Sequence, residues 1–160
     1  MRLGTCVEYN KDLYNSYDLT KWAKRYVKKL PKDVTGLLSI GASGCAIASA
    51  MMVICGEQRE LTHYHIKSKT SHQADYEPMT NIHNIEENVI AFVDDFFQTG
   101  ETFRKVMEFI ELSPHHLKEI MNIKYIITSN SKKSLLVLQA RGNPVFNGIT
   151  HISTSIYKTF

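Results

Sequence analysis

Short apolar runs alternate with helix-like stretches along the whole of this 160-residue chain. The apolar runs lie at residues 35–41, 61–67, 89–93 and 123–129, and helical periodicity covers residues 17–30, 45–54, 102–112 and, more briefly, 132–140. One or two closing strands are expected within residues 145–157. This alternation predicts a single α/β domain, residues 1–160, with a central and mostly parallel sheet flanked by helices.

The first helical stretch, residues 17–30, has apolar residues at steps of three and four and a basic opposite face. Asp18 or Thr20 is the expected N-cap, and Pro31 is expected to end the helix. Because basic residues at this spacing usually face solvent, we interpret them as a solvated surface rather than a nucleic-acid contact.

Composition narrows the choice of ligand and compartment. The net charge is only +3, which favours a small anionic ligand over extended nucleic acid. The three cysteines, Cys6, Cys45 and Cys55, show no CxxC pairing, so we expect reduced thiols rather than a disulfide framework or a structural zinc site. No stretch has the roughly 18 apolar residues of a membrane span, and the start lacks a secretion signal, so a cytoplasmic protein is expected.

Two adjacent acids, Asp94 and Asp95, end the third apolar run in the stretch VIAFVDDFFQTGETF. Neighbouring carboxylates beside a buried strand repel each other, and they are retained more easily when a cation or several hydroxyl groups compensate them. The polar turn 98–102 follows between strand and helix, where backbone N–H groups favour an anion. A ligand with a phosphate and vicinal hydroxyls satisfies both features. The simpler alternative is an ordinary turn in which Thr99 or Thr102 caps the helix.

Three segments resemble the type I phosphoribosyltransferases, which bind 5-phosphoribosyl 1-diphosphate. Residues 89–102 resemble the family signature: an apolar strand, two acids, two apolar residues, a variable position and Thr-Gly-x-Thr. The stretch SIGASGCAIASAMM (39–52) resembles the pyrophosphate-binding turn with its following helix, and looks closest to xanthine-type enzymes. The stretch HIKSKTS (65–71) resembles the end of the second strand, where a lysine reaches the diphosphate and a flexible lid begins.

The resemblance implies a ribose 5-phosphate site around the third strand. Asp94 and Asp95 would accept hydrogen bonds from the 2- and 3-hydroxyls of the ribose, close to a Mg²⁺ ion that they hold directly or through water. The residues that would surround the 5-phosphate are Gln98, Thr99, Gly100, Glu101 and Thr102.

The resemblance also implies a diphosphate site. Backbone N–H groups of Ala42, Ser43 and Gly44 would bind the diphosphate, often through a strained or cis peptide in this family. Lys67, with Lys69 as a second candidate, would neutralise the diphosphate as it leaves.

The activity implied is Mg²⁺-dependent transfer of the 5-phosphoribosyl group to a nucleobase nitrogen, with release of diphosphate. Purine salvage is preferred, because the ASG turn and DDFFQTG look most like the xanthine-type enzymes. A lid over about residues 68–87 would exclude water, and a small hood from residues 1–17 or the C-terminal segment would contact the base. Relatives are commonly dimers, so a homodimer is an expectation. The candidates for stacking on the base, with ordinary packing as the alternative, are Tyr9, Tyr14 and Tyr17.

Three positions depart from the family pattern, and two of them, Gln98 and Ser43, leave a second function open together with the short chain. Gln98 stands where hypoxanthine-guanine enzymes carry an aspartate, Glu101 adds an anion beside the phosphate, and Ser43 replaces a basic residue. The alternative is a non-catalytic regulator of the same fold that binds phosphoribosyl diphosphate or a nucleotide. A receiver domain of a two-component system also joins an acidic pair to an α/β sheet. Its pair ends the first strand, whereas Asp94 and Asp95 end the third.

Cys45, His63 and His65 receive structural interpretations. Cys45 has no recognisable catalytic partner motif, so we interpret it as a buried helix thiol rather than a nucleophile. His63 and His65 are interpreted as strand or lid surface rather than metal ligands, because no third ligand has matching spacing.

Overall fold

A computed structural model describes residues 12–66, 88–96, 101–113, 117–129 and 148–154. Its strands are β1 (Gly36–Ile40), β2 (Thr62–Ile66), β3 (Asn88–Val93), β4 (Met121–Thr128) and β5 (Thr150–Ser153). They form one sheet in the order β2-β1-β3-β4-β5, and every neighbouring pair is parallel. The predicted parallel α/β architecture is therefore confirmed, with β3 at the centre of the sheet.

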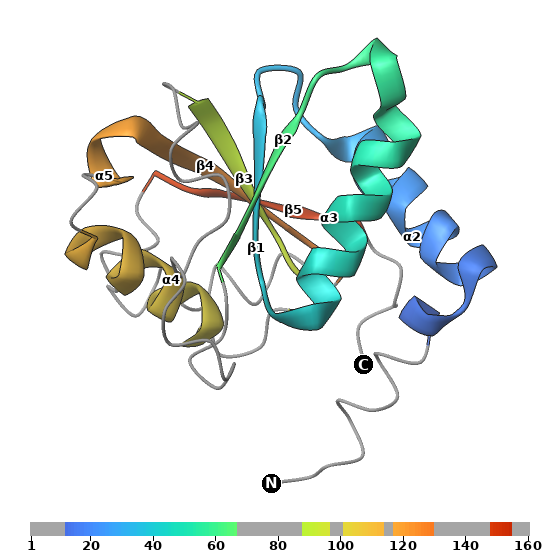
Figure 1. The fold of residues 1–160 in the computed structure, drawn as a ribbon, viewed down its shortest axis with the longest axis horizontal. Coiled ribbons are helices and arrows are strands. Elements are labelled where there is room, and N and C mark those ends of the chain that lie inside the picture. The colour runs from blue at the N-terminus through green and yellow to red at the C-terminus, as the bar shows by residue number, and fades with distance from the viewer. Residues whose placement is uncertain (1–11, 67–87, 97–100, 114–116, 130–147, 155–160) are drawn as a thin grey trace, which may run out of the picture.

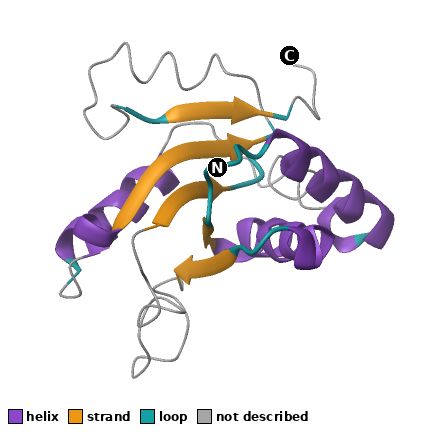
Figure 2. Cartoon of the chain, turned by 90° about the horizontal axis from the view of Figure 1, so that it is seen from above, coloured by secondary structure: helices purple, strands orange, loops and turns teal. Residues whose placement is uncertain are grey.

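Helices cover both faces of this sheet (Figures 1 and 2). The helical elements are η1 (Asp12–Tyr14), α2 (Ser16–Lys29), α3 (Gly41–Cys55), η2 (Gly56–Gln58), α4 (Glu101–Leu112) and α5 (Leu117–Ile120). The α2 and α3 helices share one core cluster with Leu37 and Val93, whereas α4 and α5 share the other with Leu38 and Phe92. Successive strand residues point to opposite faces. The strands are thus buried on both sides, which explains their nearly continuous apolar runs.

Helix α2 begins one residue earlier than the sequence predicts. Its N-cap is Asn15, whose Oδ1 accepts hydrogen bonds from the N–H groups of Tyr17 (3.0 Å) and Asp18 (3.2 Å). The prediction that Asp18 or Thr20 caps the helix is wrong. Asn15 precedes the first turn, and its side chain accepts hydrogen bonds from first-turn N–H groups that have no partner within the helix. The helix ends at Lys29, before Pro31, as predicted.

Helix α3 begins at Gly41, four residues before the predicted start. Gly41 has φ +76°, a left-handed conformation that glycine adopts without steric cost, and it turns the chain from β1 directly into the helix. The residues Ala42, Ser43 and Gly44 therefore lie in the first turn of α3, and the separate turn predicted for them is wrong. Within the described ranges, no peptide bond is cis.

Several predicted elements lie outside the described residues. These are the lid at about 68–87, the helix at 132–140 and most of both chain ends, which include the expected hood. Of the predicted closing strands, β5 is described, and the short helix α5 was not predicted. In the part of the chain that the structure describes, no helix is both long and apolar enough to cross a membrane.

Candidate functional site

The acid pair follows β3 directly and is fixed by its backbone. The N–H of Asp94 donates to the carbonyl oxygen of Ile127 at 3.2 Å, and the N–H of Ser129 donates to the carbonyl oxygen of Asp95 at 3.0 Å. The Ser129 hydroxyl donates to the same oxygen of Asp95. The two acids thus extend the pairing between β3 and β4 beyond the strand ends, at the edge of the sheet where parallel α/β folds bind ligands.

A tyrosine from the first helix also holds this segment. The hydroxyl of Tyr26, on α2, donates a hydrogen bond of 2.7 Å to the carbonyl oxygen of Asp94. Tyr26 is fully buried. The sequence placed Tyr26 on the apolar face of its helix, but nothing in the periodicity indicated that its hydroxyl would reach a residue 68 positions away.

Negative charge at the acid pair is poorly compensated. Asp94 is 8% exposed, and burial, followed by the neighbouring Asp95 carboxyl group, raises its pKa well above the ordinary value. Asp94 Oδ1 accepts a backbone hydrogen bond from the N–H of Asp95 at 2.9 Å, and Asp95 Oδ1 accepts one from the N–H of Phe96 at 2.8 Å. Among the described side chains, no ion pair to either acid occurs. A bound cation or a set of hydroxyl donors would supply the missing compensation.

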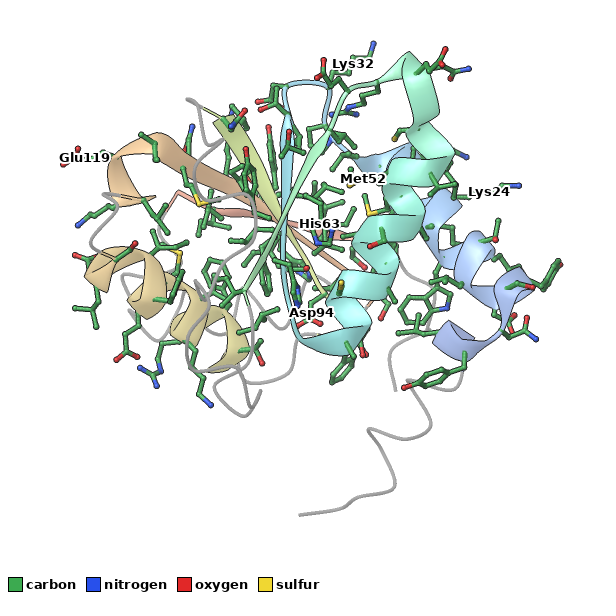
Figure 3. All side chains as sticks on the ribbon, in the orientation of Figure 1. Lys24, Lys32, Met52, His63, Asp94 and Glu119 are labelled. Carbon is green, nitrogen blue, oxygen red and sulfur yellow. The ribbon has the colours of Figure 1, made fainter. Side chains whose placement is uncertain are left out.

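The N-terminus of α3 packs against the end of β3. A Cβ atom on Gly44 would lie 2.8 Å from the carbonyl oxygen of Val93 and 3.4 Å from Cβ of Ser39. Only glycine allows this approach, which brings the first turn of α3 beside the residue before Asp94 (Figure 3). The N-cap residue of α3, Ile40, makes no side-chain capping hydrogen bond, and N–H groups in the first turn of a helix favour anions.

Of the predicted site residues, Gly44 packs against Val93, the residue directly before the Asp94–Asp95 pair. The Thr102 side chain is exposed in the first turn of α4, and Glu101 begins that helix. The other predicted site residues lie outside the described part of the chain: Lys67, Lys69, Gln98, Thr99 and Gly100.

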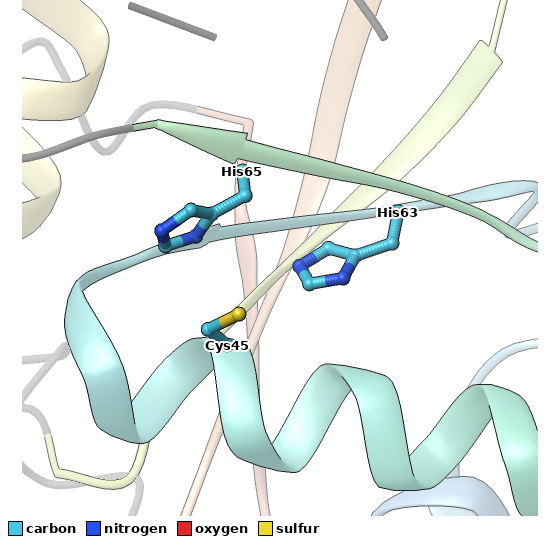
Figure 4. A group of neighbouring side chains, drawn as sticks. All are labelled: Cys45, His63 and His65. Atoms are coloured by element: carbon cyan, nitrogen blue, oxygen red, sulfur yellow. The ribbon is translucent and has the colours of Figure 1, made fainter. Parts of the chain in front are cut away.

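A second polar group lies on the same face of the sheet as α3. Cys45, His63 and His65 come together there, and each is partly exposed (Figure 4). Cys45 is therefore not the fully buried thiol that the sequence predicted. The sequence offered no third ligand of matching spacing for the two histidines, because Cys45 comes from a different element and sequence spacing could not pair it with them.

Comparison with solved structures identifies the architecture. The orotate phosphoribosyltransferase of Francisella tularensis superposes with a TM-score of 0.62 at 12% identity, covering 89% of this chain and 68% of that one. A phosphoribosyltransferase from Corynebacterium diphtheriae gives 0.67 at 11% identity, covering 93% and 85%. The chain has the phosphoribosyltransferase fold.

A third structure agrees with this assignment. The adenine phosphoribosyltransferase of Thermoanaerobacter pseudethanolicus gives a TM-score of 0.63 at 16% identity, covering 89% of this chain and 83% of that one. No family model and no curated protein sequence matches the chain. The resemblance seen in the sequence is therefore confirmed for the fold, by structures whose sequences have diverged far from this one.

Proposed function

We propose that this protein is a phosphoribosyltransferase that transfers the 5-phosphoribosyl group from 5-phosphoribosyl 1-diphosphate to a nucleobase nitrogen and releases diphosphate. The observation that carries the proposal is the contact between the start of α3 and the end of β3. This contact supports the proposal because a helix N-terminus without a side-chain cap from Ile40 starts beside the end of β3, and an anion bound there would adjoin hydroxyls bound by Asp94 and Asp95.

The acid pair has a defined task in this reaction. Ionised carboxylates accept hydrogen bonds from the 2- and 3-hydroxyls of the ribose and oppose the positive charge that develops on the sugar as the bond to diphosphate breaks. Burial raises the pKa of Asp94, so a negative charge on Asp94 beside Asp95 is disfavoured unless a partner compensates it. Substrate hydroxyls and a cation would relieve this cost, and binding would therefore favour the ionised form of Asp94.

The residues present fit a magnesium ion. Mg²⁺ prefers oxygen ligands, keeps several waters and commonly uses one or two carboxylates together with substrate phosphates. Asp94 and Asp95 supply carboxylate oxygens next to the helix terminus that would hold the diphosphate. When bound, Mg²⁺ would neutralise charge that develops on the leaving diphosphate.

The rest of the site is proposed from the sequence. Gln98, Thr99, Gly100, Glu101 and Thr102 would surround the 5-phosphate at the start of α4. Lys67 or Lys69 would bind the departing diphosphate, and a lid over about residues 68–87 would exclude water.

Purine salvage is the specificity we propose. Tyr14, at the end of η1, and Tyr17, in the first turn of α2, are 85% and 70% exposed, and both belong to the segment 1–17 that is expected to form the hood. Exposed aromatic rings in that position suit stacking on a purine. The expected homodimer and cytoplasmic location stay predictions.

The competing proposal is a regulator that binds the same sugar diphosphate without turnover. A two-part assay separates the two functions. Calorimetric titration with 5-phosphoribosyl 1-diphosphate and Mg²⁺ measures binding, and diphosphate release with a panel of purines and pyrimidines measures transfer. An enzyme shows both signals, a regulator shows binding alone, and absence of both would contradict each proposal.

A further inference from the structure

The parallel register of β1 and β2 builds a polar cluster on the face covered by α3. His63 and His65 are two residues apart on β2, so both side chains point to that face. Ser39 of β1 lies opposite His65, and Leu37 lies opposite His63. Cys45 enters the cluster from the second turn of α3 (Figure 4).

The cluster is held in a compact arrangement. The Ser39 Oγ atom is hydrogen-bonded to Nε2 of His63 at 2.7 Å and to Nδ1 of His65 at 2.9 Å. The two imidazole centroids are 6.0 Å apart. One ligand atom from each of Cys45, His63 and His65 lies within 4.8 Å of the other two.

We propose that Cys45, His63 and His65 form a binding site for one transition-metal ion of the zinc class. Thiolate and imidazole are the ligands that Zn²⁺ prefers, with bonds of about 2.3 Å to sulfur and 2.0–2.1 Å to nitrogen. Tetrahedral geometry with those bonds puts the ligand atoms roughly 3.3–3.6 Å apart. Side-chain rotations would bring the cluster to that spacing, and a water molecule would complete the coordination.

The electrostatics of the cluster agree with this assignment. Burial, followed by the neighbouring His65, lowers the pKa of His63 to about 4. Its imidazole is therefore neutral at physiological pH, which is the form that binds metals. Binding of the ion to the Cys45 sulfur would release the thiol proton to solvent.

This site differs from the proposed magnesium site in its chemistry and its position. Mg²⁺ selects oxygen ligands, whereas one sulfur and two nitrogens select zinc, cobalt or copper. The ion would cross-link α3 to β2. Cys45 directly follows the residues proposed to bind diphosphate, and Lys67 is two positions beyond His65, so metal binding would fix both elements.

Cobalt substitution tests the site on the full chain without an affinity tag, after treatment with chelator and reductant. We expect one Co²⁺ per chain, with a thiolate-to-cobalt charge-transfer band that Zn²⁺ displaces. Loss of an outer-shell partner already lowers metal affinity about 10- to 100-fold. We therefore expect Cys45→Ser to abolish the band and to weaken zinc binding by at least about 100-fold.

Matched variants separate this site from other ligands and from the proposed function. Cys55→Ser, which changes a buried thiol on the same helix outside the cluster, should leave the band intact. Asp95→Asn should also leave it intact, even if it abolishes turnover. Ser39→Ala should keep the band but bind zinc about 10-fold more weakly, because Ser39 acts by positioning the two rings.

A measurement on the unmodified protein guards against variants that do not fold. Zinc should protect Cys45 from alkylation, as read by mass spectrometry of its peptide, and chelator should restore the reaction. Absence of stoichiometric metal binding and of protection would overturn the proposal. A charge-transfer band that persists in Cys45→Ser would overturn it as well, since another cysteine would then be the ligand.

Discussion

The hydroxyl of Tyr26 donates a 2.7 Å hydrogen bond to the carbonyl oxygen of Asp94, joining the first long helix to the acid pair at the end of the central strand. Both residues are buried. The backbone of the acid pair is thus held from two sides, since Tyr26 on α2 donates to the carbonyl oxygen of Asp94 and Ser129 beyond β4 donates to that of Asp95. A rigid backbone at this position lets the two carboxylates keep a fixed direction when a ligand binds.

Replacing Tyr26 with Phe should destabilise the protein. The change leaves the buried carbonyl oxygen of Asp94 without its side-chain donor, which typically costs about 1–3 kcal/mol. Urea unfolding followed by circular dichroism measures the free energy of unfolding. Tyr17→Phe is the control. Tyr17 is 70% exposed, so loss of its hydroxyl should hardly change the free energy of unfolding. Equal stability of Tyr26→Phe and the wild type would show that the hydrogen bond does not support the site.

Replacing Gly44 with Ala should move α3 away from the acid pair. The new Cβ would lie 2.8 Å from the Val93 carbonyl oxygen, a backbone atom that cannot rotate aside. We expect a loss of about 1–3 kcal/mol in unfolding free energy, typical of overpacking, and weaker binding of the sugar diphosphate. Ser49→Ala, at an exposed position of the same helix, should change stability by less than about 0.5 kcal/mol. Unchanged stability and affinity in Gly44→Ala would contradict the close packing.

The acid pair should impose a pH-dependent cost on folding in the absence of ligand. Burial, followed by Asp95, raises the pKa of Asp94 in the folded state above its usual value of 3.8. Between pH 3.8 and the raised pKa, the folded protein therefore binds more protons than the unfolded chain. The contribution of Asp94 to stability falls as the pH rises through this range. Asp94→Asn should accordingly be more stable than the wild type at pH 7, and this difference should vanish below about pH 3.8.

Asp33 provides a control of the opposite sign. A hydrogen bond from Lys124 leads the effects that lower the pKa of Asp33, so Asp33→Asn should lose stability at neutral pH rather than gain it. Urea midpoints of the wild type and both variants between pH 3 and pH 7 would measure these effects. A destabilised Asp94→Asn at pH 7 would show that the Asp94 charge is compensated in the ligand-free protein.

Much of the fold was predictable because it depends on local patterns. The apolar runs of β1, β2, β3 and β4 are short, are bounded by polar or glycine residues and alternate with amphipathic stretches, and all four strands lie where the sequence places them. The start of α3 was not predicted, since Gly41 turns the chain into the helix without a connecting loop. Asn15 was also missed as a cap, because Asp18 and Thr20 are capping residues by type as well and lie closer to the apolar positions of the helix.

The candidate site was predictable only where its residues are neighbours in sequence. Asp94 and Asp95 stand out because two acids end an apolar run. The contacts of Tyr26 with Asp94, and of Cys45 with His63 and His65, join different elements and depend on strand register and on which face each helix covers. Periodicity shows that a residue is buried, but it does not show the partner of its polar atom.

Lys67→Ala should lower the rate of transfer without removing substrate binding. The lysine is proposed to compensate the charge of the departing diphosphate, and loss of one such electrostatic partner commonly reduces kcat by about 100-fold or more. Steady-state measurement of diphosphate release would test this, with Lys24→Ala, an exposed lysine on α2, as the control. An unchanged kcat would remove Lys67 from the mechanism and leave Lys69 as the candidate.

The most direct test of the central claim is calorimetric titration of 5-phosphoribosyl 1-diphosphate into the wild type and into the Asp94→Asn, Asp95→Asn double variant, each with Mg²⁺. The wild type should bind one molecule per chain, and the double variant should fold and show no binding, because it has lost the carboxylates for the ribose hydroxyls and the metal. Equal affinity of the two proteins, or no affinity in the wild type, would contradict the claim that the acid pair at the end of β3 is a sugar-phosphate site.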